Sequence, residues 1–422
     1  MLDAREEPVG RHVRPSEAPS SRSRVMIYSH DTFGLGHLRR SRAIANALVA
    51  ERPGLSALIV SGSPVIGSFE FGPGVDYVRV PGVTKLPSGD YRSLNLDLSI
   101  DEATRLREAI ILHTARTFDP DVLIVDKEPT GFRGEILPTL DAMHRCGCHI
   151  VLGARDVMDE PSLLGPEWER KGAVDALAAF YDEIWVYGLS AFYRPLASLP
   201  LPERLLGRTA YTGYLRREIP AEPTLANYPP LTAGPFILVT TGGGGDGDDV
   251  IEWVLSAYEA DPGIPLPAVI VFGPFINRDR RRLFLERIAR HPKLDAITFD
   301  TKLEVLMDRA AAIVAMGGYN TFCEILSLDK PALVVPRTTP RREQLIRAVE
   351  AERLGLVSKL VEGAEGREPM AMAAALRLLP ERPRPSDVTI PGLLDGLDFI
   401  RARLAAILGE AGGRTALRQA AE

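Results

Sequence analysis

The chain has 422 residues, of which 45% are hydrophobic and 25% charged, and these ordinary values exclude a largely disordered or fibrous protein. At roughly 100–200 residues per domain, the length predicts two or three domains. The formal net charge of −6, without a long basic run, gives no electrostatic argument for nucleic acid as the main partner.

The first 24 residues mix Arg, Glu, Pro and Ser without an apolar core, so they predict a flexible tail rather than a secretory signal. From residue 25 onward, short apolar runs alternate with helical patterns, beginning with a strand at 25–28 and a helix at 38–50. Further strands are expected at 57–60, 77–80, 122–125, 149–152 and 184–187. This alternation is typical of a parallel sheet that helices cover on both faces.

Five prolines interrupt the pattern at 215–235, which predicts a linker. Strands are then expected at 236–240, 268–272, 296–299, 312–315 and 332–335, with helices at 250–260, 280–290 and 390–408. The predicted organisation is a tail (1–24), a first domain (25–214), a linker (215–235), a second domain (236–389), and a C-terminal helix and tail (390–422). We therefore expect an α/β protein with two tandem doubly wound, Rossmann-like domains whose carboxyl strand ends face a common cleft.

The first glycine loop follows the strand at 25–28 and contains Gly34 and Gly36, directly before His37. Glycines between a strand and a helix let the backbone approach a ligand, and the helix N-terminus offers N–H groups to an anion. His37 is a candidate general base at the cleft, although packing or capping within the first helical turn explains a lone histidine about equally well.

The second glycine loop comprises Gly242, Gly243, Gly244 and Gly245, again between a strand and a helix. Successive glycines are entropically costly unless the backbone must curl around a ligand, and phosphate is the usual ligand at such a place. The acidic residues at 246–249 could suggest a metal site, but capping of the following helix is the favoured explanation.

A third strand–glycine–helix segment contains Gly318, Tyr319, Asn320 and Thr321 and offers N–H groups to a second phosphate oxygen. Glu324 lies one helical turn further on, where its carboxylate could accept hydrogen bonds from a ribose. Taken by itself, Glu324 is better explained as a solvated helix residue.

Together these segments resemble the GT-B glycosyltransferases, in particular the group around the N-acetylglucosaminyltransferase that makes the lipid intermediate of peptidoglycan. The matching positions are Gly318, Thr321, Glu324, Pro331, Pro336, Glu343 and Gln344. The resemblance is specific from about residue 240 to 348 and implies a hexosyltransferase with a nucleotide-diphosphate sugar donor, UDP-linked by expectation, in its second domain.

Under this resemblance, the loops at 242–245 and 318–321 hold the diphosphate, Glu324 binds the ribose, and Glu343 and Gln344 bind sugar hydroxyls. The family usually has Gln where this chain has Glu343, which leaves the identity of the sugar open. Backbone N–H groups would stabilise the leaving diphosphate, so the resemblance implies neither a metal nor a cofactor.

The segment from Gly34 to Arg40 also resembles the first loop of UDP-sugar hydrolases of nonulosonic acid synthesis, which share the fold. A nucleotide-sugar hydrolase, a 2-epimerase and a non-catalytic nucleotide-sugar sensor therefore stay as alternatives. Candidate residues on the acceptor side follow two strands of the first domain, and surface charges explain them about as well. They are Asp126, Lys127, Glu128, Arg155 and Asp156.

The three cysteines contain no CxxC pair, which argues against a disulfide framework or structural zinc and favours the reducing cytoplasm. No apolar stretch approaches the roughly 18–20 residues that a membrane-spanning helix needs, while peripheral contact with a membrane stays open. The acceptor is not identified by the sequence.

Overall fold

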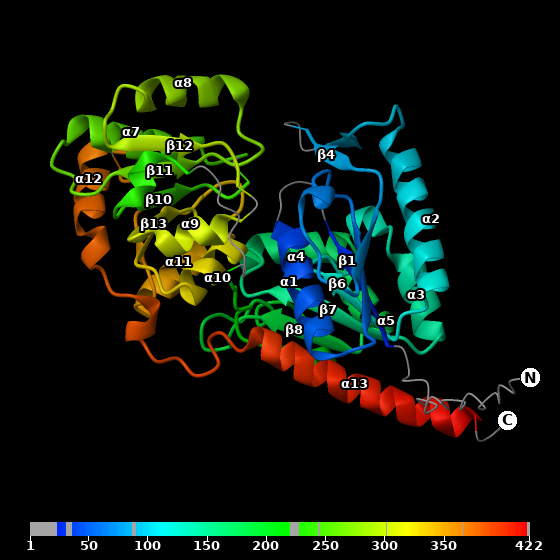
Figure 1. Cartoon of the computed structure of the whole chain (residues 1–422). Helices are drawn as coiled ribbons and strands as arrows, with labels where there is room; N and C mark the ends of the chain where they lie inside the picture. The colour runs from blue at the N-terminus through cyan, green and yellow to red at the C-terminus, as the bar shows by residue number, and fades with distance from the viewer. Residues whose placement is uncertain are drawn as a thin grey trace, which may run out of the picture.

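The computed structural model describes residues 23–30, 36–86, 90–219, 228–243, 245–300, 302–364 and 366–419, with side chains in the final helix described up to residue 409. Most of the predicted tail, part of the predicted linker, Gly34 and Gly244 lie outside the described residues. Figure 1 shows two α/β halves side by side, with a long helix from the C-terminal end of the chain running beneath the first half.

The first half is built on a parallel sheet of seven strands in the order β3-β2-β1-β6-β7-β8-β9. The strands are β1 Arg24–Ser29, β2 Ser56–Ser61, β3 Val75–Arg79, β6 Val122–Asp126, β7 His149–Arg155, β8 Glu183–Tyr187 and β9 Thr209–Tyr211. A separate antiparallel hairpin joins β4 Val83–Lys85 and β5 Tyr91–Ser93. The helices are α1 Gly36–Glu51, α2 Ile100–Phe118, α3 Leu137–Arg145, α4 Pro161–Arg170, α5 Ala173–Phe180 and α6 Glu203–Leu206.

The second half is built on a parallel sheet of six strands in the order β12-β11-β10-β13-β14-β15. The strands are β10 Ile237–Thr240, β11 Ala268–Val271, β12 Leu294–Ile297, β13 Ala312–Ala315, β14 Ala332–Val334 and β15 Ser358–Lys359. The helices from this point on are α7 Asp248–Ala260, α8 Arg278–Ile288, α9 Leu303–Arg309, α10 Tyr319–Ser327, α11 Glu343–Arg353, α12 Pro369–Leu378 and α13 Gly396–Gln419.

Both central strand pairs explain why the sequence shows short apolar runs. Val25–Tyr28 of β1 pairs in register with Val122–Val125 of β6, and Ile237–Leu238 of β10 pairs with Ala312–Ile313 of β13. These residues are at most 1% exposed, because helices cover both faces of each sheet. The structure thus confirms the expected doubly wound α/β class, with strand order reversing at β1/β6 and at β10/β13.

Two boundaries differ from the sequence prediction. Strand β12 ends at Ile297 rather than at Phe299, because Phe299 leaves the sheet and lines the cavity described below. Helix α13 begins at Gly396 rather than at residue 390, because the preceding segment pairs with residues that follow β9: the Tyr214 N–H donates to the Leu393 carbonyl at 2.8 Å, and Leu215 forms a bridge with Asp395.

Apolar contacts continue without a break from one half to the other. The Phe322 ring of α10 lies 5.2 Å from the Tyr214 ring and 5.7 Å from the Phe192 ring. Beside them, Arg347 of α11 donates two hydrogen bonds, at 2.6 and 2.8 Å, to Asp156, and both side chains are 1% exposed. The two sheets are therefore held together by a packed interface that contains a buried ion pair.

Candidate functional site

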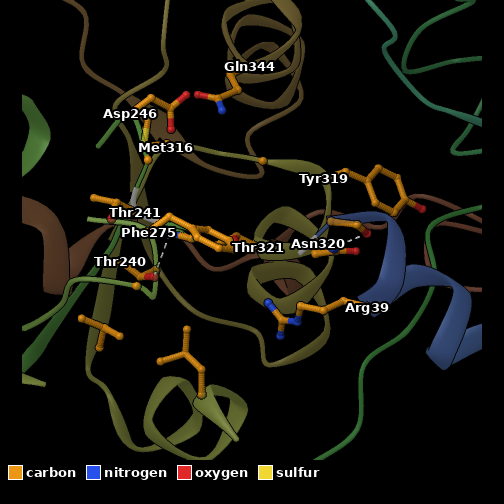
Figure 2. Close-up of a pocket in the computed structure, with 18 of the residues that line it drawn as sticks. Arg39, Thr240, Thr241, Asp246, Phe275, Met316, Tyr319, Asn320, Thr321 and Gln344 are labelled. Carbon is orange, nitrogen blue, oxygen red and sulfur yellow. Dashed lines mark hydrogen bonds between the residues drawn. The ribbon is translucent and has the colours of Figure 1, made fainter. Parts of the chain in front are cut away.

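A cavity of about 320 Å³ lies between the two sheets, at the carboxyl ends of their strands. Three helices begin at its wall: α1 with Gly36 and His37, α10 with Tyr319, and α11 with Glu343. Figure 2 shows side chains from α1, from α10 and from the loop after β10 converging on this space. Because helix N-termini carry unpaired N–H groups and partial positive charge, the wall suits a negatively charged ligand.

The glycine loop after β10 forms one wall of the cavity. Gly242 has a positive φ of 67°, its N–H donates to Thr240 Oγ1 at 3.3 Å, and the Gly243 carbonyl accepts from the Phe275 N–H at 3.0 Å. A Cβ at Gly273 would lie 2.5 Å from the Gly242 carbonyl oxygen, so only glycine allows the two loops to approach this closely. Gly242, Gly243 and Gly245 line the cavity.

The start of α10 forms the opposite wall. Gly318 is its N-cap and supplies no side-chain cap, so the first N–H groups of the helix lack intrahelical partners. The Asn320 side chain ties this helix to the first half, because its Nδ2 donates to the Gly36 carbonyl at 2.9 Å and its Oδ1 accepts from Arg217 at 2.8 Å. Gly318, Tyr319, Asn320 and Thr321 all line the cavity.

His37 and Asp126, predicted separately, form a contact at the point where the strand order reverses. His37 Nδ1 contacts Asp126 Oδ2, and Arg40 donates to both oxygens of the same carboxylate, at 2.7 Å from Nε and 2.6 Å from Nη2. Burial alone would raise the pKa of Asp126, but Arg40 and His37 hold it well below its ordinary value. Asp126 is thus a charged acceptor, which favours the His37 tautomer with its proton on Nδ1 and its lone pair on Nε2; Arg40 Nη2 lies 3.2 Å from the same Nδ1.

Glu343 and Gln344 also line the cavity, and both are held by Arg337, which the sequence analysis did not single out. Arg337 donates to Glu343 Oε1 at 2.6 Å, and its backbone N–H donates to Gln344 Oε1 at 2.9 Å. Arg337 also pairs with Asp246 beside the glycine loop. This contact compensates the negative charge of Asp246 near the expected phosphate position.

Glu324 lies deeper than the sequence suggested. It is 0% exposed and does not belong to the cavity wall, and its Oε1 accepts from Arg39 Nη2 at 2.5 Å. Arg39 also donates to Glu304 at 2.7 Å, so one guanidinium serves two carboxylates. Burial raises the pKa of Glu324 to about 7, against the pull of Arg39 and with the help of Glu304.

The acceptor-side candidates are separated by the structure. Arg155 lines the cavity, and Asp126 reaches it through His37. Glu128 and Asp156 lie outside the wall: Glu128 pairs with Lys171 at 2.7 Å and Lys127 at 3.1 Å, and Asp156 pairs with Arg347. Glu128 and Asp156 therefore have a structural role in this conformation, because cationic side chains already bind their carboxylate oxygens.

Three aromatic rings at one end of the cavity had no sequence signal. Phe69, Phe275 and Phe299 come from different segments of the chain. Phe69 forms an apolar cluster with the buried Leu38, and Phe275 and Phe299 pack against it. Such a surface offers a planar heterocycle a place to stack. The glycine loops at 242–245 and 318–321 predicted a ligand site, but they gave no indication of its apolar end.

The described residues offer neither a metal-binding cluster nor a membrane-spanning helix. They contain no group of three or more His, Cys, Asp or Glu side chains arranged to hold a metal ion. None of the helices described here combines the length and apolar character needed to span a bilayer.

Comparison with known proteins places this geometry in a recognised fold. Residues 236–364 match the family model of the glycosyltransferase family 28 C-terminal domain. No curated protein sequence matches the chain.

Solved structures resemble the chain over nearly its whole length. The structure of TcCGT1 in complex with UDP has a TM-score of 0.61 and 14% identity, covering 93% of this chain and 95% of that one. A putative UDP-N-acetylglucosamine 2-epimerase from Listeria monocytogenes has a TM-score of 0.59 and 13% identity, covering 94% and 98%. MurG from Acinetobacter baumannii has a TM-score of 0.52 and 12% identity, covering 90% and 95%. These likenesses show the GT-B fold.

Proposed function

We propose that this protein is a glycosyltransferase that moves a sugar from a nucleotide-diphosphate donor, with UDP as the nucleotide, to a hydroxyl group of an acceptor. The observation that carries the proposal is the contact between His37 and Asp126 at the wall of a cavity whose other side is made of glycine loops and helix N-termini. A base and an anion cradle that face one cavity are what the displacement of a diphosphate by a hydroxyl requires. The family match at 236–364 and the UDP in the TcCGT1 structure agree with this chemistry.

In this mechanism, His37 Nε2 removes the proton from the acceptor hydroxyl as its oxygen bonds to the anomeric carbon. The bond between that carbon and the phosphate oxygen breaks, and the electron pair leaves with the nucleoside diphosphate. Asp126 stabilises the imidazolium that forms, and Arg40 fixes the Asp126 carboxylate. The leaving charge is stabilised by N–H groups of the loops at 242–245 and 318–321.

The remaining parts of the donor follow from the geometry of the wall. Phe275 and Phe299 would stack on the uracil ring of the donor. Glu343 and Gln344 would form hydrogen bonds with the sugar. Glu324 stays the predicted ribose ligand, which requires its contact with Arg39 to open when the donor enters.

The test is a substitution at the base. We expect His37→Ala to lower kcat by at least about 100-fold, the lower end of general-base catalysis, with UDP affinity nearly unchanged. His113→Ala is the matched control, because His113 is exposed on α2, away from the cavity. Turnover is scored as UDP released from a panel of UDP-sugars with and without hydroxyl acceptors, and UDP affinity by calorimetry.

The same panel separates the alternatives. Near-normal turnover of His37→Ala would refute the base assignment. UDP release in water alone would indicate the hydrolase, a change of the sugar within the UDP-sugar the 2-epimerase, and UDP-sugar binding without turnover the sensor.

A further inference from the structure

Arg155 differs from the other arginines of the cavity wall. Arg39, Arg40 and Arg337 each donate to carboxylates. Arg155 is the last residue of β7; within the described parts of the chain its side chain makes no hydrogen bond or ion pair, and its Nε is buried without a partner. A buried, unpaired polar group costs free energy, so a residue kept in this state at a cavity wall points to a ligand that completes it.

Glu343, at the start of α11 in the other half, lines the same cavity as Arg155. Burial lowers the pKa of Arg155 to about 10, and Glu343 is the strongest influence opposing that shift. Conversely, Arg155 is the cation that acts most strongly to lower the pKa of Glu343. The two side chains nevertheless form no ion pair, and Glu343 Oε2 is buried without a hydrogen-bond partner. An unpaired donor and an unpaired acceptor thus line one cavity, one from each half of the protein.

We infer that Arg155 and Glu343 together hold a hydroxyl group of the donor sugar, and that the transferred sugar is neutral. A hydroxyl fits both groups, since it accepts a hydrogen bond from Arg155 and donates one to Glu343 Oε2. A carboxylate on the sugar would be attracted by Arg155 but repelled by Glu343. An ammonium group would be attracted by Glu343 but repelled by Arg155. The inference rests on the proposed function, because it takes the sugar to be carried into the cavity by a nucleotide.

The inference predicts that Arg155 acts on the sugar and leaves the nucleotide alone. UDP, UDP-glucose, UDP-galactose, UDP-N-acetylglucosamine and UDP-glucuronate are titrated calorimetrically into the full-length protein. For the neutral UDP-sugar that binds most tightly, we expect Arg155→Met to raise Kd by about 10-fold to 100-fold, the loss of one charge-assisted hydrogen bond, with the Kd of UDP unchanged. The Kd of the UDP-sugar for Arg155→Lys should lie between those of the wild type and Arg155→Met, because lysine keeps the positive charge but lacks the planar guanidinium.

Two further measurements exclude a structural explanation. Arg155→Met should leave the thermal midpoint nearly unchanged, since Arg155 forms no ion pair and Glu343 keeps its hydrogen bond from Arg337; Arg116→Met, at an exposed site on α2, is the matched control. Adding Glu343→Gln to Arg155→Met should weaken UDP-sugar binding by less than the two single effects combined, because both side chains hold the same hydroxyl.

If Arg155→Met weakens the binding of UDP and of the UDP-sugar equally, or weakens neither, the inference is overturned. UDP-glucuronate binding more tightly than every neutral UDP-sugar through Arg155 would also overturn it, since this outcome would make Arg155 a carboxylate site. A wild-type protein that binds no UDP would instead refute the proposed function itself.

Discussion

Replacing Asp126 by Asn tests the centre of the proposed mechanism, because one carboxylate serves both the base and a buried arginine. The Asp126 side chain is 3% exposed and that of Arg40 is 1% exposed. An amide offers one acceptor and one NH₂ group, so in Asp126→Asn either Arg40 or His37 faces a donor where it had an acceptor. The substitution therefore damages both stability and catalysis, and the two effects are measured separately.

The stability loss follows from the unpaired guanidinium. Removing one partner of a buried ion pair costs about 3–5 kcal/mol. For a domain of this size, each kcal/mol moves the thermal midpoint by about 2–4 °C, so the first unfolding transition should fall by roughly 6–20 °C. Differential scanning calorimetry resolves this transition.

The catalytic loss follows from His37. Without a charged acceptor at Nδ1, the imidazole loses its fixed orientation and the stabilisation of its protonated form, so kcat should fall by about 10²–10⁴-fold. UDP affinity should stay close to wild type, because the phosphate loops at 242–245 and 318–321 belong to the other half of the protein.

The double variant Arg40→Met/Asp126→Asn separates the two effects. It removes the buried charge that Asp126→Asn leaves unpaired, so it should recover part of the thermal midpoint. It should not recover kcat, because His37 still lacks its charged partner. Near-wild-type turnover in Asp126→Asn at a temperature where it is folded, or recovery of kcat in the double variant, would refute the reasoning.

Two other predictions concern the metal and Glu324. Turnover should survive excess EDTA, because arginines already pair with the acidic residues near the glycine loop. The pairs are Asp246 with Arg337, Asp248 with Arg280 and Asp249 with Arg367. Activity that is lost in EDTA and restored by Mg²⁺ or Mn²⁺ would contradict this prediction. Burial raises the pKa of Glu324 to about 7, above the ordinary value of about 4.5, so the folded protein holds an extra proton between these pH values. The contribution of Glu324 to stability is therefore greatest below about pH 4.5 and is lost as the pH rises through 7. Glu324→Gln should remove this loss, on the order of 2–3 kcal/mol, from chemical denaturation curves at pH 5 and pH 8, and an unchanged difference between the two would show that another group titrates.

The sequence predicted the central strands and the glycine turns because both have local causes. A strand buried on both faces must be apolar throughout, as β6 is, and a backbone that turns sharply beside another needs glycine, as at Gly242. Strands β9 and β15 escaped prediction because three and two residues are too short to show a pattern. The hairpin β4–β5 escaped because its residues mix apolar and charged side chains.

The sequence predicted which loops form the site, but it did not predict which side chains pair with one another there. Asp126 could be expected at a strand end near the cleft, yet nothing local indicates that Arg40, rather than another of the 50 Lys and Arg residues, would hold it. Glu324 is the sharper case, since its spacing suggested a ligand contact and the structure shows it buried against Arg39. That contact joins residues 285 positions apart in the chain, a separation that helical spacing cannot anticipate.

Helix α13 also determines the order in which the protein can be assembled during synthesis. Its residues Ile400 and Leu404 are 1% and 2% exposed within the core of the first half, its Arg403 pairs with Glu183 of β8 at 2.5 Å, and Figure 1 shows it spanning the base of that half. The N-terminal sheet thus depends on a segment that leaves the ribosome only after the whole second sheet has been made. We expect residues 236–389 to complete their fold first, while the sheet that begins with β1 keeps the apolar surface that Ile400 and Leu404 cover exposed until residue 408 has emerged.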